Sequence, residues 1–364
     1  MKLAVLGGGQ LASMLAHAAH PIGIRCSFLD PNPDACAAPM GEHICAAYDD
    51  PAAIGNLIHD ADCLTFEFEN VAQSAVEKLA ERLPVYPPPS ALYAARDRLV
   101  EKRLFCDLDI PTAAFVHVDS AADLPAAVEQ IGLPCVLKTR TEGYDGKGQV
   151  VLRSAEDMAS AFDRIGHRPA ILEAFVHFDR EVSVIAVRSR SGECGLYALS
   201  ENEHREGVLR LTRNLARDSR QPDAERYVQR LLEHLEYVGV LALELFEVNG
   251  ELWANEFAPR VHNSGHWTIE GAHTSQFENH VRAVLGLPLG STASLAPCAM
   301  LNLIGGIPPV EKMLELPYAH VHVYGKQPRR GRKLGHLTLR APDDRTLADL
   351  LVKARALVAQ SENG

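Results

Sequence analysis

The first thirty residues constrain the fold of this chain more than any other segment. Residues 2–6 form a short apolar strand, and Gly7-Gly8-Gly9 follows as a tight turn. A helical pattern over residues 10–19 and a second strand over 24–29, ending at Asp30, complete a strand–helix–strand unit. Two strands joined in this way lie parallel, and helices cover both faces of a parallel sheet. A further apolar strand over residues 63–68 extends the pattern, so we predict a doubly wound α/β domain here.

The length of the chain predicts more than one domain. At 364 residues it exceeds the size at which a single hydrophobic core usually stops growing. The proline-rich run 83–90 ends the first domain, which we place at residues 1–100. Beyond it we expect an amphipathic helix over 91–108, a mixed α+β catalytic region over 101–295 and a small C-terminal domain over 296–364. The last should contain strands over 299–303 and 321–324, a basic loop over 326–333 and a helix over 347–358.

Composition excludes several classes of protein. With 47% hydrophobic and 23% charged residues the chain is typical of a soluble globular protein, and its net charge of -11 argues against nonspecific nucleic-acid binding. The eight cysteines lack any zinc-like or C-x-x-C spacing, which favours reduced thiols. No apolar run approaches the roughly 18 residues that span a membrane, and no secretory signal follows Met1. We expect a cytoplasmic protein that does not bind a membrane.

The first glycine loop fits a dinucleotide-binding fingerprint in loose form. Gly7-x-Gly9-x-x-Ala12 follows a strand, and Asp30 closes the next one. A glycine turn that lets a helix N-terminus approach an anion also suits other phosphorylated ligands. Given the rest of the chain, we do not expect a nicotinamide cofactor here.

A second glycine loop lies in a predicted hairpin. A strand over 136–140 contains Lys138, the segment 143–149 reads GYDGKGQ, and a strand over 150–152 follows. Three glycines in six residues let backbone N–H groups fold over phosphate oxygens, while Lys138 and Lys147 balance the charge of ATP. The spacing excludes the P-loop class. A hairpin tip without a function is the alternative interpretation of this segment alone.

Two glutamates flank a strong hairpin signal. Strands over 241–248 and 251–257 surround Asn249-Gly250, and they contain Glu244 and Glu256. The two side chains share a face only if the numbers of paired residues add up to an even number. A two-residue turn at Asn249-Gly250 would give an odd sum, so we predict a three-residue loop with Gly250 in the left-handed region. Two carboxylates beside Asn255 would suit Mg²⁺ that bridges ATP phosphates. Solvent-facing strand glutamates are the alternative.

Two further segments are rich in hydrogen-bond donors. Residues 258–266 read APRVHNSGH, and Arg260 among them could hold a phosphoryl group or bicarbonate with both arms of its guanidinium. The run 326–333 reads KQPRRGRK, a cationic cluster in an acidic chain. It is either a solvated loop or a site for a substrate phosphate.

Together these motifs resemble a known family. The chain resembles the N5-carboxyaminoimidazole ribonucleotide synthetase family, whose members are ATP-grasp enzymes of purine biosynthesis. Three strings carry the resemblance: GYDGKGQ over 143–149, NEFAPRVHNSGHWT over 255–268 and GRKLGH over 331–336. GGGQL over 7–11 and TFEFEN over 65–70 are similar to its N-terminal domain, so the resemblance covers nearly the whole chain.

The resemblance implies an ATP-grasp fold behind an N-terminal pre-ATP-grasp domain, with 101–180 covering ATP and 181–295 holding metal and substrate. It also implies a reaction: ATP phosphorylates bicarbonate to carboxyphosphate, which the amine of 5-aminoimidazole ribonucleotide captures, with Mg²⁺ (or Mn²⁺) as cofactor. A homodimer is expected as well. Another ATP-grasp ligase, such as a formate-dependent transformylase, and a noncatalytic nucleotide sensor are the alternatives.

The family pattern also implies roles for individual residues. ATP contacts would come from Arg98, Lys138, Gly143, Tyr144, Asp145, Gly146, Lys147, Gly148, Gln149, Glu173, Ala174, Phe175, Val176, Glu181, His204, Asn255 and Glu256. Metal would be held by Glu244 and Glu256, catalysis would involve Tyr144, Asp145, Arg260 and His262, and substrate would contact Gln10, Glu69, Asn263, Lys326, Arg329, Arg332 and Lys333. One departure is Ala12-Ser13, where the family usually carries Gly-Arg. If that arginine binds the substrate phosphate elsewhere, another group must do so here.

Overall fold

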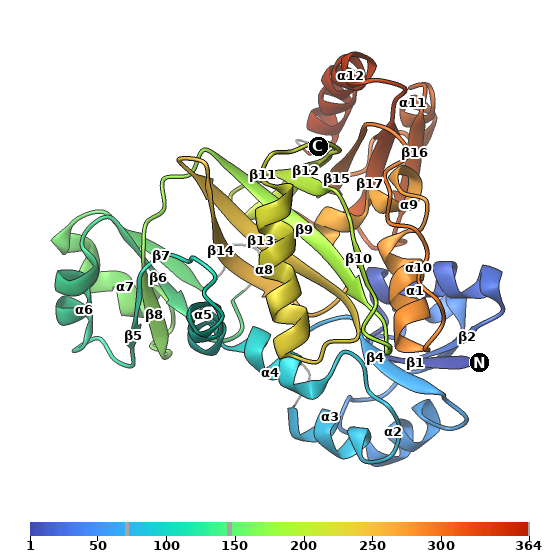
Figure 1. Cartoon of the computed structure of the whole chain (residues 1–364), viewed down its shortest axis with the longest axis horizontal. Coiled ribbons are helices and arrows are strands. Elements are labelled where there is room, and N and C mark those ends of the chain that lie inside the picture. Colours follow the sequence, from blue (N-terminus) through green and yellow to red (C-terminus); the bar gives the residue numbers. More distant parts are fainter. Residues whose placement is uncertain (70–72, 144–147, 363–364) are drawn as a thin grey trace.

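The computed structural model describes residues 1–69, 73–143 and 148–362 (Figure 1). Three β-sheets organise this part of the chain. No helix in it has the length and apolar character needed to cross a membrane. Short 3-10 helices occur at His20–Ile22, Ala38–Met40, Ala155–Asp157 and Asn263–Gly265 (η1 to η4).

The first sheet is parallel, as the opening segment predicts. Its strands are β1 (Lys2–Leu6), β2 (Arg25–Leu29), β3 (Glu42–Ile44) and β4 (Cys63–Phe66), in the order β3-β2-β1-β4. Helix α1 (Gln10–Ala19) packs between one face and α10 (Gln276–Val284), while α2 (Pro51–Leu57) and α3 (Gln73–Ala80) contribute to the core on the other face. The doubly wound arrangement is therefore confirmed.

The single helix expected over 91–108 is wrong, because two helices occupy this segment. They are α4 (Pro89–Arg96) and α5 (Arg98–Asp107), and the break is at Asp97, whose backbone is extended (φ -117°, ψ 110°). The Asp97 carboxylate accepts a hydrogen bond from Leu99 N at 2.9 Å and so caps α5. It also accepts from Arg140 Nε at 3.0 Å. The amphipathic pattern does not reveal this break, because the break depends on a partner that is distant in the sequence.

A separate lobe contains the second sheet, seen at the left of Figure 1. Its antiparallel strands are β5 (Phe115–Val118), β6 (Cys135–Thr139), β7 (Gln149–Leu152) and β8 (Ala170–Ala174), in the order β5-β8-β6-β7. Helices α6 (Leu124–Ile131) and α7 (Met158–Arg164) pack on it through an apolar core of its own. The predicted hairpin is confirmed, since β6 pairs with β7 and Lys138 lies opposite Gln149. Residues 144–147 of its glycine loop lie outside the described residues.

The third sheet has nine strands and runs through the rest of the molecule. Its members are β9 (Arg180–Arg188), β10 (Cys194–Leu196), β11 (Leu199–Arg205), β12 (Val208–Leu215), β13 (Gly239–Val248), β14 (Glu251–Ala258), β15 (Cys298–Ile304), β16 (Ala319–Val323) and β17 (Lys333–Arg340). The order is β14-β13-β9-β11-β12-β15-β17-β16, with β10 beside β9. The remaining helices are α8 (Gln221–His234), α9 (Thr268–Gly271), α11 (Val310–Leu314) and α12 (Asp344–Glu362).

The C-terminal elements agree with the sequence pattern except at one strand. Strands β15 and β16 and helix α12 correspond to the predicted segments. Strand β17 was not predicted; its first residue, Lys333, ends the basic run that was interpreted as a loop. Leu211 of β12 pairs with Leu301 of β15, so strands on both sides of residue 296 share one sheet.

Candidate active site

One cavity of about 760 Å³ is lined by strands of the second and third sheets and, from the N-terminal domain, by the start of α1 and the residues that follow β4. Most of the expected site residues line it: Gln10, Glu69, Arg98, Lys138, Gly143, Gln149, Glu173, Ala174, Phe175, Val176, Glu181, His204, Glu244, Asn255, Glu256, Arg260, His262, Asn263 and Lys333. Gly148, Lys326, Arg329 and Arg332 are not among its lining residues. Tyr144, Asp145, Gly146 and Lys147 lie outside the described residues.

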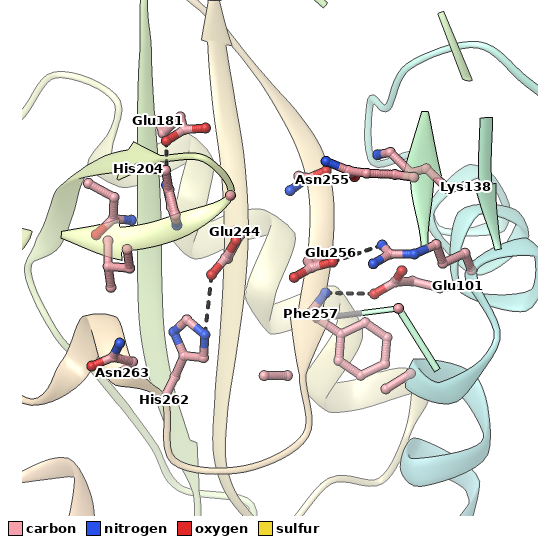
Figure 2. A pocket seen from close by; sticks show the side chains of 18 of the residues that line it. Glu101, Lys138, Glu181, His204, Glu244, Asn255, Glu256, Phe257, His262 and Asn263 are labelled. Carbon is pink, nitrogen blue, oxygen red and sulfur yellow. Dashed lines mark hydrogen bonds and ion pairs between the residues drawn. The ribbon is translucent and has the colours of Figure 1, made fainter. Parts of the chain in front are cut away.

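Glu244 and Glu256 lie directly opposite each other on β13 and β14, which confirms the even pairing sum (Figure 2). The predicted three-residue loop is wrong. Val248 pairs with Glu251 across a two-residue turn in which Asn249 (φ 50°) and Gly250 (φ 80°) are both left-handed, as a type I′ turn requires. The register shifts by one residue between Glu244 and Leu245. Asn255 is therefore an extra residue, a β-bulge, and the bulge brings the two glutamates together.

The two carboxylates differ in their surroundings. Burial and the nearby Glu256 charge raise the pKa of Glu244 to about 7. Burial would also raise the pKa of Glu256, but the cation of Arg98, whose Nη1 donates to Glu256 Oε2 at 2.8 Å, lowers it below its usual range. A cation between the two carboxylates would relieve their repulsion. Within the described residues no group of three or more His, Cys, Asp or Glu side chains could hold a metal. Two carboxylates fit Mg²⁺, which usually keeps waters and binds substrate phosphates besides one or two carboxylates.

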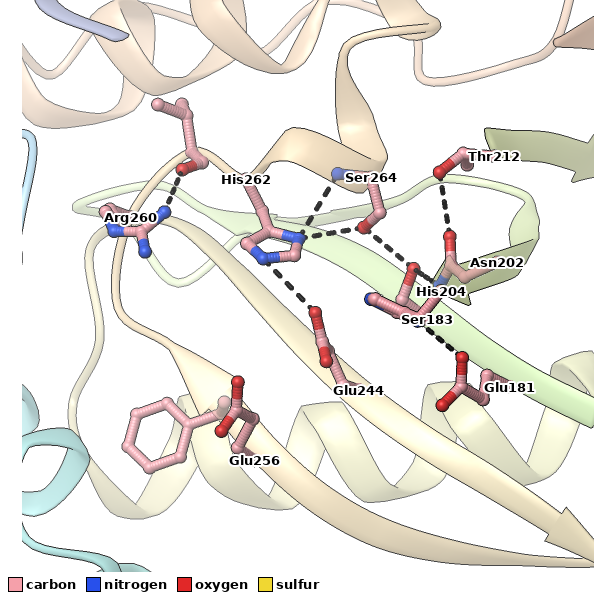
Figure 3. Close-up of polar contacts among 12 residues, drawn as sticks. Glu181, Ser183, Asn202, His204, Thr212, Glu244, Glu256, Arg260, His262 and Ser264 are labelled. Atoms are coloured by element: carbon pink, nitrogen blue, oxygen red, sulfur yellow. Dashed lines mark hydrogen bonds and ion pairs between the residues drawn. The ribbon is translucent and has the colours of Figure 1, made fainter. Parts of the chain in front are cut away.

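A buried chain of hydrogen bonds fixes the tautomer of His262 (Figure 3). Thr212 donates to Asn202 Oδ1 at 2.9 Å, and Asn202 donates to Ser183 Oγ at 2.9 Å. Ser183 in turn donates to Ser264 Oγ at 2.8 Å. The backbone N–H of Ser264 donates to His262 Nδ1 at 3.3 Å, so that nitrogen is an acceptor. The proton therefore lies on Nε2, which is 3.2 Å from Glu244 Oε1.

Glu173 on β8 is held between two lysines. Lys138 Nζ lies 2.9 Å from its Oε2 atom and Lys102 Nζ lies 3.6 Å from it. Burial would raise the pKa of Glu173, but these cations lower it to about 2, so the side chain is ionised. Its other oxygen, Oε1, is buried without a hydrogen-bond partner in the described part of the chain. That oxygen is an open acceptor at the cavity.

Other expected residues pair with one another around the cavity. His204 forms a short hydrogen bond with Glu181, and although burial lowers the pKa of His204, this contact raises it overall. Arg260 Nη2 lies 2.6 Å from Glu69 Oε1. The amide oxygen and nitrogen of Asn263 are both buried and have no hydrogen-bond partner among the described residues. Open polar atoms of this kind suit a polar ligand.

The basic run contacts the first domain through Lys326. Lys326 Nζ forms a short hydrogen bond with Gln10 Oε1, and Gln10 lines the cavity. Arg329 is exposed, and Arg332 donates to Gln327 O at 3.3 Å.

Three buried charged residues at or beside the cavity had no ligand role predicted from the sequence: Glu67 and Glu101, which line it, and Lys102, which lies behind it. Glu67 accepts hydrogen bonds from the N–H groups of Gly9 and Ala12, where a phosphate would have to bind the first glycine loop. A signal for the other two exists in retrospect, since Arg98, Glu101 and Lys102 have the i, i+3, i+4 spacing of one helix face.

Comparisons with known proteins agree with this geometry. The chain matches the family models for the ribonucleotide synthetase preATP-grasp domain over residues 1–96, the ATP-grasp domain over 103–277 and the phosphoribosylaminoimidazole carboxylase C-terminal domain over 298–349. The fold and the site thus define an ATP-grasp ligase.

Individual relatives narrow the class to one family. An N5-carboxyaminoimidazole ribonucleotide synthase of Pseudomonas aeruginosa is 54% identical over 98% of this chain and 99% of its own length. The crystal structure of the synthetase from Thermus thermophilus has a TM-score of 0.94 at 50% identity and covers 99% of both chains. A structure from Aspergillus clavatus in complex with ADP and 5-aminoimidazole ribonucleotide has a TM-score of 0.91 at 29% identity, over 99% of this chain and 98% of its own. The chain belongs to the N5-carboxyaminoimidazole ribonucleotide synthase family.

Proposed function

We propose that this enzyme joins bicarbonate to the exocyclic amine of 5-aminoimidazole ribonucleotide at the expense of ATP, in purine biosynthesis. The γ-phosphoryl group moves to a bicarbonate oxygen, which gives ADP and carboxyphosphate. The amine then attacks the carbonyl carbon, the bond from that carbon to the phosphate oxygen breaks, and the amine loses a proton. The products are N5-carboxyaminoimidazole ribonucleotide, ADP and phosphate. The observation that carries this proposal is the Glu244–Glu256 pair, which faces a cavity also lined by Lys138 and Arg260.

We assign ATP to the side of the cavity between the second and third sheets. Lys138, beside the glycine hairpin, can reach phosphate oxygens. Gly148 has a φ of +72° and packs so closely against Thr139 that a Cβ there would lie 2.6 Å from Thr139 Oγ1, so this end of the hairpin requires glycine. The open Glu173 Oε1 can accept from an adenine amine. Ala174 ends β8, and Phe175 and Val176 follow it in the connection to β9. Glu181 and His204 face the same cavity, and Arg98 and Asn255 complete the set.

We assign Mg²⁺ to Glu244 and Glu256, with Mn²⁺ as a substitute. When bound, the ion would neutralise charge on the ATP phosphates and on the transferring phosphoryl group. The protein would orient its ligands through Arg98 at Glu256 and His262 at Glu244.

We assign bicarbonate and the ribonucleotide to the side that meets the first sheet. Arg260 has a planar, two-armed cation for an oxyanion, and its Nε is buried without a partner among the described residues. Asn263 offers both amide atoms, and Gln10 and Glu69 approach from the first domain. Lys326, Lys333, Arg329 and Arg332 supply the positive charge that a substrate phosphate needs. Tyr144 and Asp145 remain assigned from the family pattern alone.

The larger organisation is proposed in the same way. We place the domains at 1–100, 101–295 and 296–364, and we expect a homodimer in the cytoplasm. Sedimentation equilibrium should give twice the chain mass. A monomer at micromolar concentration would contradict the dimer.

The decisive experiment is an ADP-release assay in which each substrate is omitted in turn. Release should require bicarbonate, Mg²⁺ and aminoimidazole ribonucleotide together. Support by formate in place of bicarbonate would favour a transformylase, and ATP binding without turnover would favour a nucleotide sensor. Either result would refute the proposed carboxylation.

A further inference from the structure

We infer that Lys102 and Glu101, adjacent residues of helix α5, are positioning residues that hold the backbone on both sides of Glu256. The inference rests on the proposed metal role of Glu256. Neither side chain needs to touch a substrate. Each acts on the β-bulge at Asn255, which determines where the Glu256 carboxylate lies.

The bulge needs support because its peptide groups leave the regular ladder. An extra residue in one strand disrupts the local hydrogen bonding between the strands. Lys102 supplies the missing donors, since its Nζ donates to Asn255 O at 2.8 Å and to Ala254 O at 3.3 Å. The ammonium therefore binds the two carbonyl groups that immediately precede Glu256.

Glu101 acts on the other side of Glu256. Its Oε1 atom accepts a hydrogen bond from Phe257 N at 2.7 Å, which Figure 2 shows beside the Glu256 carboxylate. The ring of Phe105, one turn along α5, lies edge-on to that of Phe257 with centroids 6.2 Å apart. The backbone from 254 to 257 is thus attached to α5 at both ends.

The same helix also holds the Glu256 side chain. Arg98 lies three and four residues before Glu101 and Lys102, so all three side chains share one face of α5. Arg98 binds the Glu256 carboxylate, and its two neighbours bind the peptide groups around it. One helix face therefore fixes both the position and the orientation of a proposed metal ligand.

Burial indicates that these two ionisable side chains have a specific role. Lys102 is 1% exposed and Glu101 is 2% exposed, and charged groups are costly to bury unless they are paired and hydrogen-bonded. Lys102 also donates to Thr112 Oγ1 at 3.0 Å and lies 3.6 Å from Glu173 Oε2. Thr112 in turn donates to Ala254 O at 2.7 Å. The ammonium connects the bulge with β8 of the ATP-covering lobe.

The test measures the Mg²⁺ requirement of five variants at saturating ATP. Partners that orient metal ligands are typically worth about 10- to 100-fold in metal affinity or activity. Lys102→Met and Glu101→Met should raise the half-saturating Mg²⁺ concentration at least about tenfold. Glu101→Gln should restore most of the wild-type requirement, because an amide oxygen accepts the same bond from Phe257 N. The KM for the ribonucleotide should change less than about twofold in all of them, since Gln10 and Lys326 are untouched.

Leu104→Ala is the matched control. Leu104 is a buried residue of the same helix and makes no side-chain hydrogen bond to the hairpin, so its loss should lower the unfolding temperature without changing the Mg²⁺ requirement. An equal Mg²⁺ requirement in Lys102→Met and Leu104→Ala would overturn the inference, as would a parallel rise in the KM for the ribonucleotide. Glu256→Gln is measured alongside. If Glu256→Gln leaves the Mg²⁺ requirement unchanged, the metal assignment itself has failed; if only Lys102→Met leaves it unchanged, the positioning role alone has failed.

Discussion

The carboxylate of Glu67 accepts a hydrogen bond from the backbone N–H of Ala12 at 2.9 Å. A second, short bond joins it to the N–H of Gly9. These donors form the N-terminus of helix α1, the position where a dinucleotide fold binds a pyrophosphate. A side chain of the protein fills that position here, so the fingerprint in the sequence marks a structural contact between α1 and the residue that follows β4.

The first prediction concerns the stability that this contact provides. Glu67→Leu should lower the free energy of unfolding by about 1–3 kcal/mol, because it leaves buried N–H donors without an acceptor. Glu67→Gln, whose amide oxygen still accepts, should lose less. Urea titration checks both. Equal midpoints for wild type and Glu67→Leu would contradict the role of Glu67 as an internal cap.

A second prediction follows from the chain of hydrogen bonds behind His262. Ser183→Ala breaks the chain between Asn202 and Ser264, so the imidazole should lose its fixed orientation toward Glu244. We expect kcat to fall about tenfold, with little change in the KM for ATP. Ser189→Ala is the control, since that buried serine near the end of the same strand bonds Ser191. A similar loss in both variants would mean that the chain does not orient His262.

A third prediction separates metal binding from folding. Glu256→Gln keeps the volume of the side chain and a partner for Arg98 but removes one negative charge from the proposed metal site. ADP release should fall at least about 100-fold, because the carboxylate is a hard anionic ligand of Mg²⁺. Glu251→Gln, at an exposed position on the same strand, should retain full activity. Comparable activity in Glu256→Gln and wild type would remove Glu256 from the list of ligands.

A fourth prediction concerns acid stability. His280 lies between two domains: its Nδ1 accepts from Val240 N at 3.1 Å and its Nε2 contacts Thr65 Oγ1 at 2.9 Å. Burial lowers its pKa from 6.5 to about 3. Below pH 6.5 the unfolded imidazole gains a proton that the folded one refuses, so the free energy of unfolding should decrease as the pH falls from 6.5 toward 3. One such proton changes it by about 1.4 kcal/mol per pH unit.

The variant His280→Asn should lose this dependence. Between pH 5.5 and 4.5 the slope of its free energy of unfolding against pH should be smaller than that of the wild type by about one proton equivalent. Its stability at pH 8 should be lower than that of the wild type. Urea unfolding at each pH gives both slopes. Parallel profiles for wild type and variant would show that His280 does not contribute to the pH dependence.

Local patterns predicted the regular elements of this fold well. Helix α1 begins and ends where the apolar spacing indicates, and the even pairing sum expected for Glu244 and Glu256 is present. The bulge at Asn255 produces that sum, and not the three-residue loop that we predicted. The bulge at Asn255 could not be predicted, because Lys102 and Glu101 stabilise it from a helix some 150 residues earlier in the chain. The break at Asp97 depends in the same way on Arg140. A sequence pattern records which faces are apolar, whereas these features depend on which distant polar group lies nearby.

The site shows the same division. Residues in the recognisable strings around 173, 204, 244 and 256 were predicted to lie together, and they line one cavity. The sequence did not predict the supporting residues Glu67, Glu101 and Lys102, because charged side chains in an amphipathic segment usually face solvent.

The pairing of β12 with β15 limits how this protein can be divided or recombined. Leu211, Thr212 and Arg213 of β12, in the region to which we assign the metal, pair with residues 299–301 on one side. A fragment that ends before residue 298 would expose an open strand edge next to the catalytic strands, and such edges promote aggregation. An exchange of the last segment between relatives would have to preserve this register, because β12 and β15 form one continuous sheet across residue 296.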